Sequence, residues 1–66
     1  MNQICVSLGE SGWLATYQGP HAALIRAAFG QDTIPTIYTS ACPIGVVIAE
    51  LRVRNPGARV VHWLEA

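Results

Sequence analysis

Residues 3–18 read QICVSLGESGWLATYQ, and this stretch predicts a β-hairpin. Alternate positions are apolar on both sides of a central turn: Ile4, Val6 and Leu8 before it, and Trp13, Ala15 and Tyr17 after it. This period of two is typical of strands that bury one face. Residues 9–12, GESG, supply the turn, with glycine at both ends. The hairpin is therefore the framework onto which the rest of the chain folds.

The next segment, residues 20–29, predicts a short helix. Gly19-Pro20 ends the second strand, and proline suits the first turn of a helix because its missing N–H has no partner there. Alanine and leucine, which favour helices, fill much of the segment. Gly30 suits the left-handed residue that ends many helices. We expect one face of this helix to pack inward, formed by His21, Leu24, Ile25 and Ala28.

Residues 31–40 are rich in β-branched side chains but contain Pro35. Proline donates no hydrogen bond to a sheet, so a strand that contains it lies at an edge or begins with it. We therefore expect either a connector or a short edge strand over residues 36–38.

A second helix is predicted from Ser40 to about Arg54. Ser40 is a good N-cap, which would place residues 41–43 in the first turn. Residues 55–57, NPG, end this helix. Residues 58–64 are β-rich and apolar on both faces, which favours a central strand. The predicted fold is a single α+β domain over residues 1–66, in the order β-β-α-(β)-α-β. Its two helices pack on one face of a three- to four-stranded sheet.

The composition indicates that the chain has a partner. Only 12% of its 66 residues are charged, against about 25% in an average soluble domain. By contrast, 52% are hydrophobic. A domain this small buries only about 60% of the surface of its unfolded chain. Some apolar side chains should therefore remain outside, where a second copy or another protein would cover them.

The second predicted helix has two apolar stripes. At about 100° per residue, one stripe should face the sheet, made of Ile44, Val47, Ile48 and Leu51. A second stripe lies on the opposite side, made of Val46, Ala49 and Val53, with Glu50 close by. A helix that is apolar on both sides is normally buried on both sides. We expect Val46, Ala49 and Val53 to form a homodimer or hetero-complex interface; the alternative is that they are scattered surface residues.

Three of the four cations surround the NPG turn: Arg52, Arg54 and Arg59. Arginine binds phosphate through paired hydrogen bonds, so this cluster is the alternative site, for an anion or a nucleic acid. Trp63 and Tyr17 would offer stacking surfaces. The formal net charge is zero and lysine is absent, however, whereas nucleic-acid binders usually carry a basic excess. We therefore expect no nucleic-acid partner, and read the arginines as cations favoured at a helix C-terminus.

Catalytic and metal chemistry finds little support in the residue pattern. Cys42 is the strongest candidate for redox or nucleophilic chemistry, because a position in the first turn of a helix favours the thiolate form of cysteine. A thioredoxin-like active site would need a second cysteine at position 45, where this chain has Gly45. A zinc site would have to combine residues that are far apart in sequence, without the usual close pairs: Cys5, His21, Cys42 and His62. The four acids are not grouped: Glu10, Asp32, Glu50 and Glu65. We expect no enzyme activity and no cofactor.

The chain has neither a signal-like N-terminus nor an apolar run near the ~20 residues of a membrane span. Two cysteines do not form a disulfide framework of the kind found in small secreted domains. We expect a cytoplasmic protein that does not contact membranes.

The hairpin, the Gly30-Gln31-Asp32-Thr33 turn and the helix that follows resemble the partial-ribonuclease-like domain of HicB-type antitoxins. The resemblance covers about half the chain and implies oligomerisation and a toxin partner. Ile34-Pro35 stands where such domains usually carry Glu-Ala. The family also generally lacks a helix between its second and third strands. The prediction that combines these observations is a small non-enzymatic interaction or oligomerisation domain.

Overall fold

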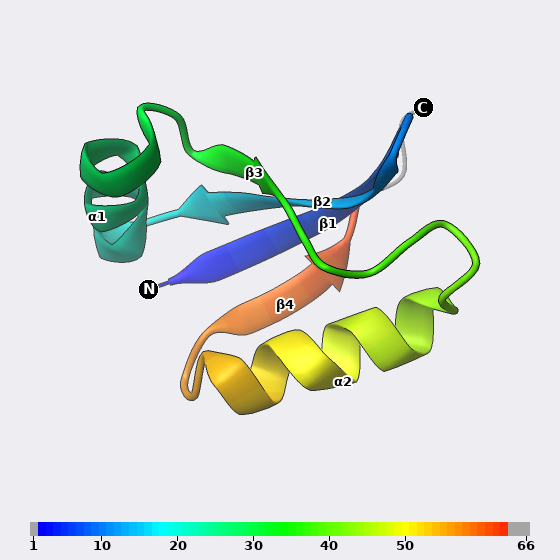
Figure 1. The fold of residues 1–66 in the computed structure, drawn as a ribbon. Coiled ribbons are helices and arrows are strands. Elements are labelled where there is room, and N and C mark those ends of the chain that lie inside the picture. Colours follow the sequence, from blue (N-terminus) through cyan, green and yellow to red (C-terminus); the bar gives the residue numbers. More distant parts are fainter. Residues whose placement is uncertain (1, 64–66) are drawn as a thin grey trace.

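The computed structural model describes residues 2–63 and has an α+β fold, a four-stranded mixed sheet with two helices (Figure 1). The predicted fold class is confirmed. The elements in chain order are β1 (Gln3–Gly9), β2 (Gly12–Gln18), α1 (Pro20–Phe29), β3 (Thr33–Pro35), α2 (Ile44–Arg54) and β4 (Arg59–His62).

The predicted hairpin is confirmed as the antiparallel pair β1 and β2 at the centre of the sheet. Gly9 pairs with Gly12, so Glu10 and Ser11 form a two-residue connection. The apolar residues of the two strands lie opposite one another, as in the pair Val6 and Ala15. This register brings the apolar alternation of both strands onto the same face.

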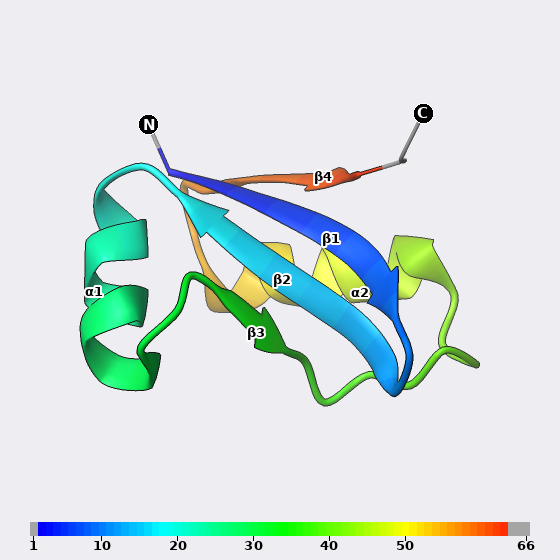
Figure 2. The ribbon, with the colours of Figure 1, turned by 90° about the horizontal axis from the view of Figure 1, so that it is seen from above.

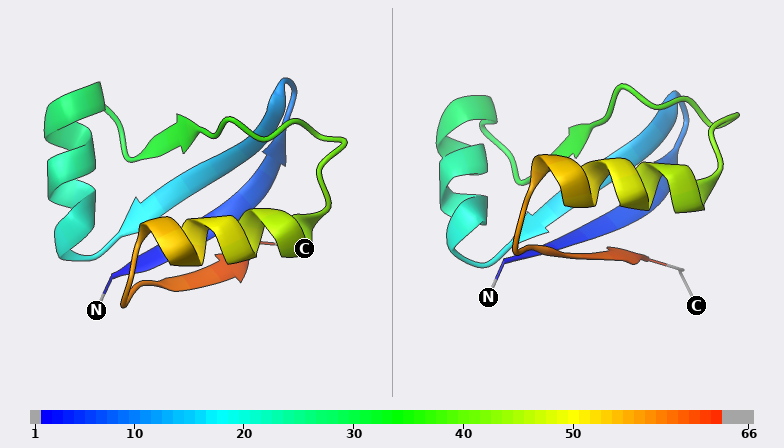
Figure 3. Two further views of the ribbon diagram at one scale, coloured as in Figure 1. Left: turned by 60° about the horizontal axis from the view of Figure 1, so that its bottom comes forward. Right: turned by 90° about the horizontal axis from the view of Figure 1, so that it is seen from below.

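The strands are ordered β3-β2-β1-β4, and this order makes a crossover necessary. β3 is antiparallel to β2 and β4 is parallel to β1, so β3 and β4 run in the same direction at opposite edges. Strands that run in the same direction need a long connection, usually a helix. Residues 36–58 provide this connection, and α2 passes across one face of the sheet (Figures 2 and 3).

The hydrophobic core lies between this face of the sheet and α2. Ile4, Val6 and Val47 are its largest fully buried side chains. The other buried members of the core are Trp13, Ala15, Tyr17, Ala22, Leu51 and Val60. The predicted inner stripe of α2 is thus confirmed, with Val47 and Leu51 buried and Ile44 and Ile48 partly buried against the core.

The short α1 packs beside β2 at one end of the sheet (Figure 2). Gly19 and Pro20 begin it, and Gly30 ends it in the left-handed conformation, as predicted. Its predicted inner face was partly wrong, because Leu24 and Ala28 are exposed. Ala22 is the buried residue of the helix instead, with Ile25 packed against the core. The helix contacts the sheet mainly through its first turns, so its far end is solvated.

The edge strand β3 covers Thr33–Pro35, not the predicted residues 36–38. Pro35 ends this strand at the sheet edge, which is a position that proline tolerates. The residues after Pro35 do not continue the strand, but three hydrogen bonds still connect them to Trp13 of β2. The carbonyl oxygen of Trp13 accepts bonds from the Thr36 N–H (2.9 Å) and hydroxyl (2.8 Å), and the Trp13 N–H donates to Tyr38 O (3.0 Å).

Two further boundaries differ from the prediction. α2 begins at Ile44, with Pro43 in an extended conformation at the N-cap, so Ser40 does not cap it. The Trp13 indole N–H donates to Cys42 O (2.8 Å), and this bond holds residue 42 in the loop. β4 is an edge strand and not a central one, and Leu64, the end of the predicted strand, lies outside the described residues.

Two glycine substitutions test the tight approach of the loop to β2. Gly12 has φ +138°, and a Cβ atom here would lie 2.7 Å from the Tyr38 carbonyl oxygen. We expect Gly12→Ala to lower the free energy of unfolding by about 2–3 kcal/mol. Gly45→Ala is the matched control, because Gly45 is helical with no atom near its Cβ position. It should raise stability by about 1 kcal/mol. Urea unfolding measures both, and equal effects would contradict the described loop.

Candidate interaction surface

The outer face of α2 is an exposed apolar stripe. Val46 is 48% exposed and Val53 is 76% exposed, and Ala49 between them is also exposed. Val47 on the inner side of the same helix is fully buried. The three residues that the sequence singled out therefore lie together on the side of α2 that faces away from the sheet. We call Val46, Ala49 and Val53 the outer stripe.

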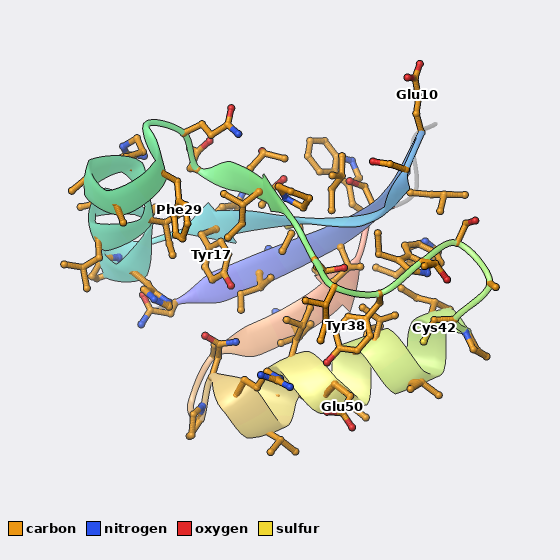
Figure 4. All side chains as sticks on the ribbon, viewed as in Figure 1. Glu10, Tyr17, Phe29, Tyr38, Cys42 and Glu50 are labelled. Atoms are coloured by element: carbon orange, nitrogen blue, oxygen red, sulfur yellow. The ribbon has the colours of Figure 1, made fainter. Side chains whose placement is uncertain are left out.

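Two charged residues border the outer stripe on opposite sides. At about 100° per residue, Glu50 falls on one flank of the stripe and Arg52 on the other. Figure 4 shows the Glu50 side chain on the exposed side of the helix. Among residues 2–63, the ion pair between Arg26 and Asp32, with a nitrogen–oxygen distance of 3.3 Å, involves neither of them.

The three candidate arginines do not converge on one pocket. Arg52 and Arg54 are both exposed, but helical geometry directs them to opposite flanks of α2. Arg59 lies on β4 in register with Gln3, on the sheet face that α2 leaves uncovered. Of the two proposed stacking residues, Tyr17 is buried and its ring meets His21 edge-on, at a centroid distance of 5.0 Å. Trp63 is half exposed.

The two cysteines lie in different surroundings. Cys42 is half-buried and lies before α2, so the first-turn position on which the thiolate argument rested is wrong. Cys5 is buried on the uncovered face of the sheet, within 3.8 Å of Gln18 Oε1. Within residues 2–63 no three His, Cys, Asp or Glu side chains cluster in a way that would hold a metal ion.

The two histidines are separated as well. His21 lies against Tyr17, while the His62 ring meets Trp13 edge-on at a centroid distance of 5.7 Å. Each therefore packs on a core aromatic residue at a different end of the sheet.

None of the described helices is long and apolar enough to cross a membrane.

A hollow between the sheet and α2 that is open to solvent was not predicted from the sequence. It has a volume of about 170 Å³, and two tyrosines, Tyr17 and Tyr38, line it with Arg54. Burial raises the pKa of the Tyr17 phenol above its ordinary value of 10.0, at which a phenol is already neutral at physiological pH. The alternation of β2 indicates that Tyr17 faces inward, but only the folded loop brings Tyr38 to the same place.

The comparisons with known proteins identify no relative of the chain. A scan against protein-family models found no match, and neither the curated proteins nor the solved structures contained one. The resemblance to HicB-type domains therefore has no independent support. The structure also retains the departure from that family, because α1 separates β2 from β3.

The environments of the two thiols predict different reactivities. On the folded protein at neutral pH, iodoacetamide should alkylate half-buried Cys42 at an ordinary rate and leave Cys5 protected until unfolding. Mass spectrometry of peptides from timed reactions measures both rates. Cys42→Ser is the control and should remove the faster reaction. Alkylation of Cys42 about tenfold faster than that of free cysteine would instead indicate an activated thiol.

Proposed function

We propose that this chain is a non-enzymatic interaction domain that self-associates through the outer stripe of α2. The observation that carries the proposal is the exposure of Val46 and Val53 on the side of the helix opposite the core. An apolar helix face that remains outside the core is stabilised when a second surface removes it from water. The proposed partner is a second copy of the chain.

The shape of the outer stripe suits close helix packing. Ala49 lies between the two valines, and a small residue at the centre lets two helix backbones approach closely. Val46 and Val53, on either side, supply the apolar area. A twofold-symmetric pair of α2 helices would bury the stripe of each chain against the same stripe of the other.

The flanking charges favour a parallel arrangement of the two helices. When two copies face each other in parallel, Glu50 of one chain lies beside Arg52 of the other. In an antiparallel pair, each charge would instead lie beside its own copy. Opposite charges across an interface fix its register more than they add affinity. The parallel pair is therefore the proposed geometry.

The area of the stripe sets the expected strength. Three residues per chain cover much less than the roughly 800 Å² per partner of a standard interface. The proposed dimer is thus weak and depends on concentration. Its apolar centre makes it nearly insensitive to salt, whereas a phosphate contact through the arginines would weaken steeply as salt rises.

Mass in solution tests this proposal. Size-exclusion chromatography with light scattering, over a range of protein concentrations, should show the mass rising from one chain toward two at both low and high salt. The double variant Val46→Glu/Val53→Lys should stay monomeric because it places charges in the apolar contact. Both sites are exposed, so circular dichroism should show an unchanged fold.

Leu24→Lys is the matched control, since Leu24 is 68% exposed on α1 and lies outside the outer stripe. This variant should associate like the parent. Glu50→Arg should weaken a parallel pair by placing two arginines together and leave an antiparallel pair unchanged. A parent that is monomeric at every concentration, or a double variant that associates as the parent does, would contradict the proposal.

A further inference from the structure

Cys5 is nearly buried on the face of the sheet that α2 leaves uncovered. Both helices contribute to the core on the opposite face, and Figure 2 shows the sheet in front of α2. Cys5 is nevertheless only 7% exposed. It lines an open hollow together with Val61, its partner in the register of β1 and β4. Gln3, Gln18 and Trp63 also line this space, which we call the Trp63 hollow.

Two glutamine side chains form a fixed pair in the Trp63 hollow. Gln3 and Gln18 lie opposite each other in the register of β1 and β2, and Gln3 Nε2 donates to Gln18 Oε1 (3.2 Å). The Cys5 thiol contacts both amides, since its sulfur accepts from Gln3 Nε2 (3.5 Å) and its S–H donates to Gln18 Oε1 (3.8 Å). Among residues 2–63, these bonds leave the Gln3 carbonyl oxygen as an acceptor and the Gln18 amino group as a donor for another molecule.

Trp63 gives the hollow an aromatic side. Its backbone is fixed just beyond the end of β4, because the Trp63 N–H donates to Val6 O at 2.8 Å. Side chains that are two residues apart on an extended chain share a face, so the indole lies on the same side as Val61. Trp63 is 50% exposed, and an exposed indole offers a surface on which a planar ring can stack.

The charge on this side of the sheet has one sign. The four strands contain no aspartate or glutamate, and Arg59 is their one arginine. Arg59 is exposed and pairs in register with Gln3, which places it beside the Trp63 hollow. The ion pair described for residues 2–63, between Arg26 and Asp32, does not involve it. Arginine binds phosphate through paired hydrogen bonds. Since the net charge of the chain is zero, one phosphate suits this face better than a polymer of phosphates.

We propose that the Trp63 hollow binds a mononucleotide. The base stacks on Trp63, the amides of Gln3 and Gln18 bond to its edge, and Arg59 holds the phosphate. With adenine, the exocyclic amino group donates to Gln3 Oε1 and the neighbouring ring nitrogen accepts from Gln18 Nε2. Stacking on an aromatic side chain combined with bonds to the base edge is a usual way to hold an unpaired base.

A peptide is a poorer match to the same groups. Its backbone also offers one donor and one acceptor, but it has neither a ring for Trp63 nor a phosphate for Arg59. The Trp63 hollow lies on the face of the sheet opposite α2, so the proposed dimer through the outer stripe leaves it open. Binding of a nucleotide and self-association can therefore be tested separately.

Adenosine monophosphate (AMP) is the probe, and two-dimensional NMR of the labelled protein is the measurement. AMP should cause saturable shifts in the millimolar range at the amides of Cys5 and Val61 and at the Trp63 indole N–H. Ribose phosphate, which lacks the base, should bind about tenfold more weakly. Adenosine, which lacks the phosphate, should bind about threefold more weakly, because Arg59 is exposed to solvent.

Three variants assign the roles of the side chains. Trp63→Ala should weaken AMP binding about tenfold, whereas Leu24→Ala, at an exposed position on α1, should not change it. Arg59→Gln should remove the advantage of AMP over adenosine and leave adenosine binding unchanged, and Arg52→Gln on α2 is its matched control. Gln18→Ala should weaken AMP and adenosine alike and leave ribose phosphate unchanged. The three sites are exposed, so circular dichroism should show an unchanged fold.

The proposal is overturned if AMP causes no saturable shift at Cys5, Val61 and Trp63. It is also overturned if ribose phosphate binds as well as AMP, because the contact would then be an anion on Arg59 alone. Equal binding of AMP by Trp63→Ala and the parent would exclude stacking and overturn it. Single-stranded decadeoxyadenylate that binds about a hundredfold more tightly than AMP would indicate a nucleic-acid strand instead of a mononucleotide.

Discussion

The parallel pairing of β4 with β1 is the constraint on which the rest of the fold depends. β3 ends at one edge of the sheet and β4 begins at the other, running in the same direction. The chain must therefore cross the sheet between them, and α2 makes most of that crossing. The crossing helix covers the apolar face of the hairpin and closes the core around Ile4, Val6 and Val47.

A single helix in this position has two different environments. Its inner side replaces the water that would otherwise cover the hairpin, and this burial is the main source of stability in so small a domain. Its outer side meets no other element of residues 2–63, yet it carries valines at Val46 and Val53. The flank with Arg54 borders the open hollow beside β2, so the same helix closes the core and carries the stripe of the proposed dimer.

The sequence predicted those features that depend on neighbouring residues. The hairpin follows from alternation, α1 from its proline and glycine boundaries, and the two stripes of α2 from helical periodicity. The edge position of β4 was not predicted, because apolar residues on both faces also suit an edge strand whose second face, with Val61, lies on the uncovered side of the sheet. That uncovered side depends on where the helices pack, which periodicity does not specify.

Other differences have a tertiary cause. Ser40 is a good N-cap by type, but it lies in a turn that the bond from the Cys42 N–H to Thr39 O (2.9 Å) closes. The Trp13 indole, which donates to Cys42 O, holds this turn against β2, and the helix begins only after Pro43. The edge strand covers Thr33–Pro35 and not residues 36–38, because the residues after Pro35 leave the sheet ladder and bond to β2 only at Trp13. The hollow could not be predicted from the sequence either, because its lining residues Tyr17, Tyr38 and Arg54 come from three separate segments. Local sequence patterns do not predict contacts between residues that are far apart in the chain.

The most direct test of the central claim is an isotope-filtered NOE experiment on an equal mixture of ¹³C-labelled and unlabelled protein. It detects contacts between methyl groups of different chains and so identifies the residues at the interface. The account predicts intermolecular NOEs between the Val46 and Val53 methyl groups of one chain and the same stripe of the other. Intermolecular NOEs at Val61 and Trp63 on the uncovered sheet face, without any at the outer stripe, would contradict it. So would the absence of all intermolecular NOEs at the highest soluble concentration.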